Sequence, residues 1–513
     1  MRSHRWNVTA SVAVALMSAL LVAALLPGLA LGKPAASAHS TGFESFEPTL
    51  GTTSNGDIYF SITPTSGVAA GWDASIAKST DGGKSWKDVG PRLPTGHSMP
   101  PETNDPYIYV DPSTDRVFTF HMAPILLCAN LSYSDDGGKT WQNNPNGCSP
   151  TAVYDHQTIV AAKPRETATN GYPNILHQCV NAIYAAMCAT STDGGFSWGP
   201  AVPVYPKPEP TQTCGAQHGH LAAGPDGHVF LPTSLCGTFP TVFISGDDGK
   251  TWRESRIAEI ETPFVDPTVS VDSKGNLYAS FIDERGFLYF TTSTNNGKKW
   301  AKPIRAAEGY TGNMPVIVAG DPGKVAIAYP ATNDLAKGYD TEGYLDGSEA
   351  EVAKKVDWGA NFTVSFNALA PKPKFKTVVS TGKDPLGRGR ICVRATRCDY
   401  LIDFIEAVIG PDGRPYASFS DGCLDLCVKG EGPNKSGTGV GVLTTLQTGP
   451  KLCSSTCWRY KPAGKGQMSL AEALLFAGTP KQQASSSAHG RVPLGLQLLR
   501  DQATRRRLDA VGR

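Results

Sequence analysis

The chain has 513 residues and a formal net charge of +1. This balance offers no electrostatic attraction to a polyanion, so the composition speaks against a nucleic-acid partner. Glycine (54) and proline (39) are abundant, whereas charged residues make up only 18%. Such a composition is typical of an all-β protein rich in turns rather than of a helical one.

The first residues predict export from the cytoplasm. A basic start (Arg2, His4, Arg5) precedes an apolar run over residues 12–31, and Ala36-Ser37-Ala38 offers small residues for cleavage. We therefore predict a signal peptide over residues 1–38 and a secreted protein. The apolar run is long for a signal peptide, so an uncleaved membrane anchor is the alternative, and only then would the chain meet a membrane.

Twelve cysteines agree with an oxidising compartment, where an even number favours disulfides. They fall into close sequence pairs, and pairing between neighbours is our hypothesis: Cys128 with Cys148, Cys179 with Cys188, Cys214 with Cys236, Cys392 with Cys398, Cys423 with Cys427, and Cys453 with Cys457. The alternative is a zinc site formed by the last two pairs, because zinc prefers two close pairs of ligands that converge.

An eight-residue motif, Ser-x-Asp-x-Gly-x-x-Trp, recurs five times at intervals of about 50 residues, the length of one four-stranded propeller blade. The copies span residues 79–86, 134–141, 191–198, 245–252 and 293–300. The acidic or amide side chain can bind backbone amides of a tight turn, and the tryptophan can anchor it. We predict structural roles for the five Asx residues: Asp81, Asp136, Asp193, Asp247 and Asn295.

A second repeat, a strand, a turn and another strand, precedes each motif and is clearest from Asp266 onward. Seven copies predict an all-β fold with a single β-propeller of seven blades over residues 45–460, and six blades are the alternative. Blades six and seven lack the eight-residue motif, and blade six has an insertion near residues 333–357. Residues 464–513 change to a composition rich in serine, alanine, glutamine and arginine, which predicts a basic, mobile tail outside the propeller.

Through these motifs the chain resembles the sialidase-like superfamily of BNR/Asp-box β-propellers, over roughly residues 46–446. The resemblance implies the fold and leaves open whether the chain is a sialidase, another glycosidase or a non-catalytic binding propeller. A sialidase would need three arginines for the sugar carboxylate, a tyrosine nucleophile backed by a glutamate, and an acid/base aspartate. The family's Arg-Ile-Pro motif is absent, and the nearest match, Arg92-Leu-Pro94, follows the first Asp box. No catalytic residue is therefore carried over. The arginines that could supply a cluster are Arg253, Arg285, Arg305, Arg388, Arg390 and Arg394.

Propellers place ligands at the axial face where the innermost strands begin. Aligning the turn glycines of the second repeat predicts equivalent positions, one per blade, at Glu47, Asp105, Asp155, His218, Asp266, Met314 and Phe404. Asp403 and Glu406 flank the last of these, and His156 and His220 neighbour two others. The candidates for catalysis are Asp105, Asp155, Asp266, Asp403 and Glu406. The candidates for ligand binding are Glu47, Asp105, Asp155, His156, His218, His220 and Asp266.

Three interpretations of these residues stay open. They can cap the strand starts by binding backbone amides. They can form a glycan site in which carboxylates accept sugar hydroxyls and Tyr107 or Tyr154 stacks on a ring. They can hold Ca²⁺ or another divalent cation. We predict a secreted monomer that recognises extracellular carbohydrate or glycoprotein, with an active exo-glycosidase and a protein-binding scaffold as the alternatives.

Overall fold

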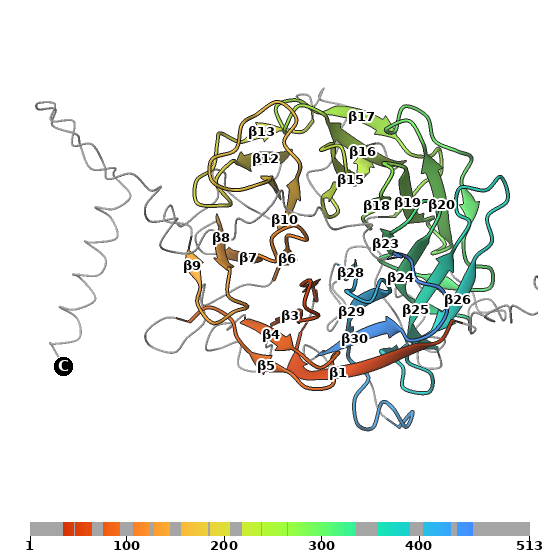
Figure 1. Ribbon diagram of the computed structural model, residues 1–513. Coiled ribbons are helices and arrows are strands. Elements are labelled where there is room, and N and C mark those ends of the chain that lie inside the picture. Colours follow the sequence, from red (N-terminus) through yellow and green to blue (C-terminus); the bar gives the residue numbers. More distant parts are fainter. Residues whose placement is uncertain are drawn as a thin grey trace, which may run out of the picture. The chain divides into compact units, whose positions relative to one another are not determined.

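The computed structural model describes residues 34–45, 47–63, 75–92, 106–123, 128–143, 155–182, 185–205, 218–236, 239–263, 265–334, 356–389, 404–431 and 439–454. The chain forms two compact units, residues 1–466 and 467–513, and every described residue belongs to the first. Within the described residues all regular elements are strands, and they form seven sheets arranged in a ring (Figure 1).

Each of the first five blades is a four-stranded antiparallel sheet that follows the chain from the axis outward. Blade one contains β2 (Leu50–Thr52), β3 (Ile58–Ile62), β4 (Ser75–Ser79) and β5 (Lys87–Asp88). Blade two contains β6 (Ile108–Val110), β7 (Val117–Ala123), β8 (Cys128–Ser134) and β9 (Gln142–Asn143). Blade three contains β10 (Asp155–Ala162), β11 (Ile175–Asn181), β12 (Ala186–Ser191) and β13 (Val202–Pro203). Blade four contains β14 (Ala222–Ala223), β15 (Val229–Cys236), β16 (Phe239–Ser245) and β17 (Arg253–Arg256). Blade five contains β18 (Thr268–Val271), β19 (Leu277–Ile282), β20 (Leu288–Ser293) and β21 (Ile304–Arg305).

The last two blades are less regular. Blade six contains β22 (Thr311–Gly312), β23 (Val316–Ala319), β24 (Val325–Thr332), β25 (Asp357–Ser365), β26 (Lys376–Val379) and β27 (Gly387–Arg388). Blade seven contains β28 (Glu406–Ile409), β29 (Pro415–Asp421), β30 (Val440–Leu446) and β1 (Ala36–Glu44). The prediction of a seven-bladed all-β propeller is confirmed, and the six-bladed alternative is wrong.

The ring is closed by β1, which pairs antiparallel with β30. The pairing starts at Ala36 opposite Leu446 and runs to Ser40 opposite Val442 before a register shift. Closure of this kind removes the exposed edges of an open sheet. The predicted cleavage after Ala38 falls inside this strand, while residues 1–33 lie outside the described residues. The signal peptide therefore stays a prediction. None of the described residues forms a helix able to span a bilayer.

The Asp boxes hold the outer turn of their blades. In blade four, Asp247 accepts hydrogen bonds from the Ser245 hydroxyl (2.9 Å), the Thr251 backbone N–H (3.0 Å) and the Thr251 hydroxyl (2.6 Å). Asp81, Asp136 and Asp193 bind their turns in the same way. In blade five, Asn295 accepts from the Ser293 hydroxyl and the Lys299 N–H, both at 2.9 Å. These residues are engaged inside their own turns.

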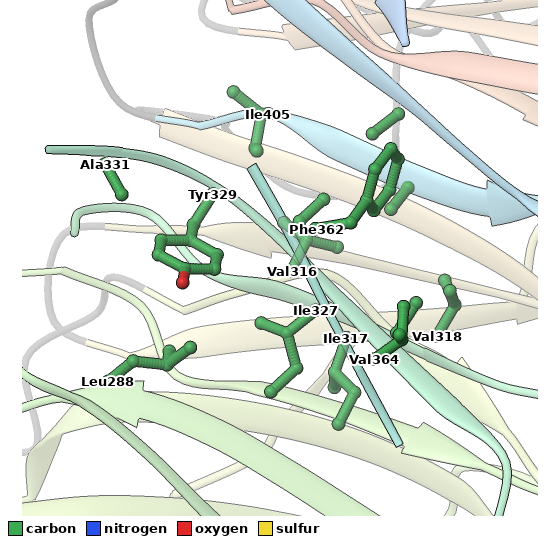
Figure 2. Packing of buried hydrophobic residues seen from close by; sticks show 14 of the residues in the cluster. Leu288, Val316, Ile317, Val318, Ile327, Tyr329, Ala331, Phe362, Val364 and Ile405 are labelled. Carbon is green, nitrogen blue, oxygen red and sulfur yellow. The ribbon is translucent and has the colours of Figure 1, made fainter. Parts of the chain in front are cut away.

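Adjacent blades pack against each other through the buried apolar side chains of their strands. Figure 2 shows the largest cluster, in which Val316, Ile317 and Val318 of β23 lie among Ile327 of β24, Phe362 of β25 and Ile405, which directly precedes β28. All six side chains are buried, so this interface excludes water and stabilises the inner strands of blades six and seven.

Two of the predicted disulfides are present in the described residues. Cys179 on β11 lies directly opposite Cys188 on β12 and is bonded to it, and Cys423 is bonded to Cys427. Cys453 is also disulfide-bonded. Zinc binds cysteine as the free thiolate, and a cysteine in a disulfide has none to offer. The alternative of a zinc site at these cysteines is therefore wrong. The other predicted pairs include side chains outside the described residues.

Candidate functional site

The register of the inner strands defines which residues occupy equivalent places at the axial face. The backbone N–H of Thr49 donates to Ser61 Oγ (2.9 Å), and that of Glu406 donates to Ser418 Oγ (3.1 Å). Thr268 lies opposite Ser280 at the corresponding place of blade five, and their hydroxyl oxygens are 2.9 Å apart. The strand starts of blades one, five and seven therefore share one geometry.

Blade three departs from the predicted alignment by one residue. A β-bulge separates Asp155 from Thr158, because three residues of β10 span two residues of β11. Thr158 then takes the place of Thr49: its hydroxyl accepts the N–H of Leu221 in the next blade, as Thr49 accepts that of Ile108. His156 precedes Thr158 by two residues, as Glu47 precedes Thr49, and its φ of 46° is close to the 49° of Glu47. His156, rather than Asp155, is the equivalent of Glu47.

Two imidazole–carboxylate pairs meet at this face, and each joins blades that are not neighbours. His220 of blade four lies with Nδ1 2.7 Å from Glu406 Oε2 of blade seven. His156 of blade three lies with Nδ1 3.2 Å from Asp266 Oδ2 of blade five. The His156 Nδ1 atom is also 2.9 Å from the backbone oxygen of His218. Four of the predicted ligand or catalytic residues are thus brought together in two pairs.

The aromatic ring of Phe404 lies beside both imidazoles. Its centroid is 5.5 Å from that of His156 and 5.0 Å from that of His220, both edge-on. The repeat places Phe404 among the equivalent positions but predicts no role for it. Phe404 thus packs against both imidazoles and is itself buried.

The exposure of the paired groups decides which of them can meet a ligand. The side chains of His220, Glu406 and Asp266 keep 15%, 13% and 14% of their surface accessible, whereas His156 keeps 2%. Three of the four groups are therefore accessible to a ligand, whereas the buried His156 contacts Asp266 without reaching the surface.

Three other predicted residues are buried. His218 is buried, its Nδ1 lies 3.0 Å from the Gly219 oxygen, and burial lowers its pKa to about 4. Glu47 is 1% exposed. Tyr107 is 3% exposed, its hydroxyl lies 3.1 Å from Thr158 Oγ1, and its ring packs edge-on against His220. The prediction that Tyr107 stacks on a sugar is wrong, because its ring fills the space between blades.

The remaining candidates lie outside the described residues. Asp105, Asp403 and Tyr154 are among them, and only the backbone of Asp155 is described, at the start of β10. Within the described ranges, no group of three or more His, Cys, Asp or Glu side chains is arranged to hold a metal ion. The divalent cation stays a prediction that depends on those carboxylates.

A groove of about 730 Å³ lies elsewhere, between the Asp-box turns of blades one and two. Its lining includes Lys78, Trp86, Lys139 and Trp141, and no axial residue contributes to it. Both indole N–H groups donate to backbone oxygens, of Gly83 and Val89 respectively. The groove is thus built from the structural tryptophans of the repeat.

Comparisons with known proteins agree with the repeat pattern. Residues 174–329 match the family model of a BNR repeat-like domain. A sialidase from Micromonospora viridifaciens is 25% identical over 210 residues, which cover 36% of this chain and 30% of that protein. The chain thus matches less than a third of that relative's length.

Solved structures similar to the chain have low identity. A protein of unknown function from Dyadobacter fermentans is 16% identical, with a TM-score of 0.43 over 82% of this chain and 100% of that one. An α-L-arabinanase from Penicillium chrysogenum, complexed with arabinobiose, is 16% identical, with a TM-score of 0.39 over 58% and 93%. A Hadza microbial sialidase is 18% identical, with a TM-score of 0.36 over 55% and 63%.

Proposed function

We propose that this sialidase-like β-propeller with BNR repeats is a secreted protein that recognises extracellular carbohydrate at its axial face. The observation that carries the proposal is the convergence of His220, Glu406 and Asp266 around Phe404. Ligand sites in proteins typically combine an apolar surface with a few convergent polar groups that fix orientation.

The chemistry of these groups suits a sugar. Carboxylates accept hydrogen bonds from hydroxyls, and charge-assisted bonds of this kind are stronger than neutral ones. Because His220 Nδ1 contacts Glu406, Nε2 is the imidazole nitrogen that would bind a ligand. A sugar hydroxyl can both donate and accept, so it can satisfy an imidazole and a carboxylate together.

A glycoside hydrolase is the second candidate, favoured by one specific observation. Two partly exposed carboxylates, Asp266 and Glu406, lie on the same face and each contacts an imidazole. Paired carboxylates can act as acid and as base or nucleophile at a glycosidic bond. This candidate predicts turnover that a binding protein would lack.

The test uses the full chain on an array of neutral and acidic glycans. Glu406→Gln and Asp266→Asn keep the side-chain volume and remove the charge, whereas Lys139→Gln alters the outer groove and serves as the control. We expect wild-type binding that both axial variants weaken by at least tenfold and that the control retains. Equal binding by all four proteins, or none by the folded wild type, would overturn the proposal. Release of fluorophore from a sialoside or arabinofuranoside, lost in Glu406→Gln, would establish the hydrolase.

A further inference from the structure

The strand that closes the propeller begins only a few residues after the apolar run at the start of the chain. That run ends at Leu31, and β1 begins at Ala36. The first three residues of β1 each lie opposite a residue of β30: Ala36 and Leu446, Ser37 and Thr445, Ala38 and Thr444. Pairing within a sheet holds an N-terminal segment that would otherwise be poorly ordered. Residues 36–38 therefore belong to the propeller.

Contacts of the closing strand begin even before Ala36. The backbone oxygen of Ala35 accepts the N–H of Gln447 at 2.7 Å, and the side-chain amide of Gln447 donates to Ser37 Oγ at 2.8 Å. Pro34 lies against Gly449, where an added Cβ atom would come within 3.1 Å of the Pro34 Cα atom. The segment that follows β30 is thus bound by residues 34–37.

The small side chains of this segment also cover apolar surface. Ala36 and Ala38 are half-buried and pack against the largest apolar cluster of the propeller, to which Val442 and Leu446 of β30 belong. Side chains alternate between the two faces of a strand, so the two alanines lie on the same face of β1. Their removal would expose part of this cluster to water, which costs free energy in proportion to the apolar area.

Cleavage after Ala38 would therefore damage the closure of the ring. It would remove three of the six residue pairs that join β1 to β30, and Gln447 would lose the acceptor of its backbone N–H. The outer edge of β30 would be left open beside residues 444–446, and open sheet edges favour aggregation. The small residues at 36–38 are explained by their place in the sheet, without a role in cleavage.

The sequence offers an earlier cleavage site with the same kind of residues. Ala30 and Gly32 are small residues separated by one position, as a leader peptidase requires before the bond that it cuts. A leader that ends at Gly32 has 32 residues, close to the usual range of about 15–30, whereas one that ends at Ala38 has 38. The earlier site also follows the apolar run directly, without Lys33 in between.

We propose that the leader is removed at the Gly32–Lys33 bond, so that the mature chain begins at Lys33 and keeps the whole of β1. The reaction is the hydrolysis of one peptide bond: water adds across it, which leaves a carboxylate on Gly32 and an α-amino group on Lys33. This inference rests on the export that the proposed function includes, and it adds the processing site.

This processing site lies at the end of blade seven away from the glycan site. β28 starts at the axial face with Glu406, and the antiparallel strands β29 and β30 then return to that face and leave it again. Leu446, the last residue of β30, is therefore at the far end, and Ala36 lies opposite it. Processing at Lys33 leaves the axial face unaltered, so glycan binding and processing are tested independently.

The experiment follows the N-terminus of the secreted protein. The full chain, residues 1–513 with a C-terminal affinity tag, is produced in a secreting bacterial host and recovered from the medium. Intact mass and N-terminal sequencing give the first residue. Gly32→Leu and Ala38→Leu are a matched pair of variants, because each replaces the small residue before one of the two candidate bonds by the same large side chain.

We expect wild type to begin at Lys33. Gly32→Leu should reduce the amount of this species at least tenfold, whereas Ala38→Leu should still begin at Lys33. The mass identifies the N-terminus whether or not a variant folds well. Secreted wild type that begins at His39, or a Lys33 species that Gly32→Leu does not reduce, would overturn the inference. A full-length precursor that stays with the cells would contradict export itself, whereas glycan binding by the axial face is judged by Glu406→Gln.

Discussion

The Nδ1 atom of His220 lies 2.7 Å from the Oε2 atom of Glu406, and this contact joins blades that stand three positions apart in a ring of seven. Blades four and seven thus meet through these two side chains, and β28 of blade seven lies near the middle of Figure 1. The Glu406 Oε1 atom also accepts the N–H of Ala407 at 2.9 Å. The carboxylate is therefore fixed by its own strand and presents one oxygen to the imidazole.

A double-mutant cycle measures the strength of this pair. His220→Gln, Glu406→Gln and the double variant should show a coupling of about 1–3 kcal/mol in the free energy of unfolding, because the bond is charge-assisted and mostly screened from solvent. Urea unfolding of the four proteins gives the value. A coupling below about 0.5 kcal/mol would mean that the contact contributes little to holding the two blades together.

Acid should destabilise the propeller through three buried histidines. Burial lowers the pKa of His121, His177 and His218 to about 4 from an ordinary 6.5. In each case the pKa in the folded state is lower than that in the unfolded chain, so the unfolded chain takes up protons first as the pH falls. The stability contributed by the neutral imidazoles is then present above pH 6.5 and is lost as the pH falls toward 4.

At pH 5 the loss should reach about 2 kcal/mol per histidine. His177→Leu removes one titrating group of similar size and should lessen the fall in unfolding free energy between pH 7.5 and pH 5. The measurement is urea unfolding at both values. If the unfolding free energy fell equally in wild type and variant, protonation of His177 would not contribute to the loss of stability in acid.

The Asp boxes offer a test of structural equivalence between blades. Asn295 makes in blade five the bonds that the Oδ1 atom of Asp247 makes in blade four. Asp247→Asn should therefore lose only the bond from the Thr251 hydroxyl and lower the melting temperature slightly. Asp247→Ala should lower it by several degrees, since it also frees the Ser245 hydroxyl and the Thr251 N–H. Equal melting temperatures for the two variants would contradict this assignment.

Ring closure by β1 predicts a dependence on the exact N-terminus. A chain that starts at His39 lacks three of the residue pairs with β30, those of Ala36, Ser37 and Ala38. It should unfold at a lower temperature than a chain that starts at Lys33, which keeps the whole strand. Calorimetry of the two proteins measures the difference in their melting temperatures. Equal melting temperatures would show that this part of β1 adds nothing to closure.

The sequence predicted the blades well because the Asp box and the strand–turn–strand repeat are local signals. The serine, the aspartate or asparagine, and the glycine of each box meet inside one turn. Together with the tryptophan, their spacing alone identifies the box. The closing strand gave no such signal, because Ala36–Glu44 follows directly after an apolar run and pairs with residues some 400 positions away.

The site was predicted only in part. The strand starts could be aligned, and the alignment pointed to His220, Asp266 and Glu406, which the structure places in imidazole–carboxylate pairs. The bulge after Asp155 could not be seen, since a bulge adds one residue without changing the residue pattern.

The most direct test of the central claim locates the ligand. Hydrogen–deuterium exchange of the full chain should be measured with and without arabinobiose, sialyllactose and polygalacturonate oligosaccharides, each at saturating concentration. If glycans bind the axial face, at least one of them should slow exchange in residues 218–221 and 404–409, where His220 and Glu406 lie. Protection confined to the outer groove around Trp86 and Trp141, or no protection by any of these glycans, would contradict it.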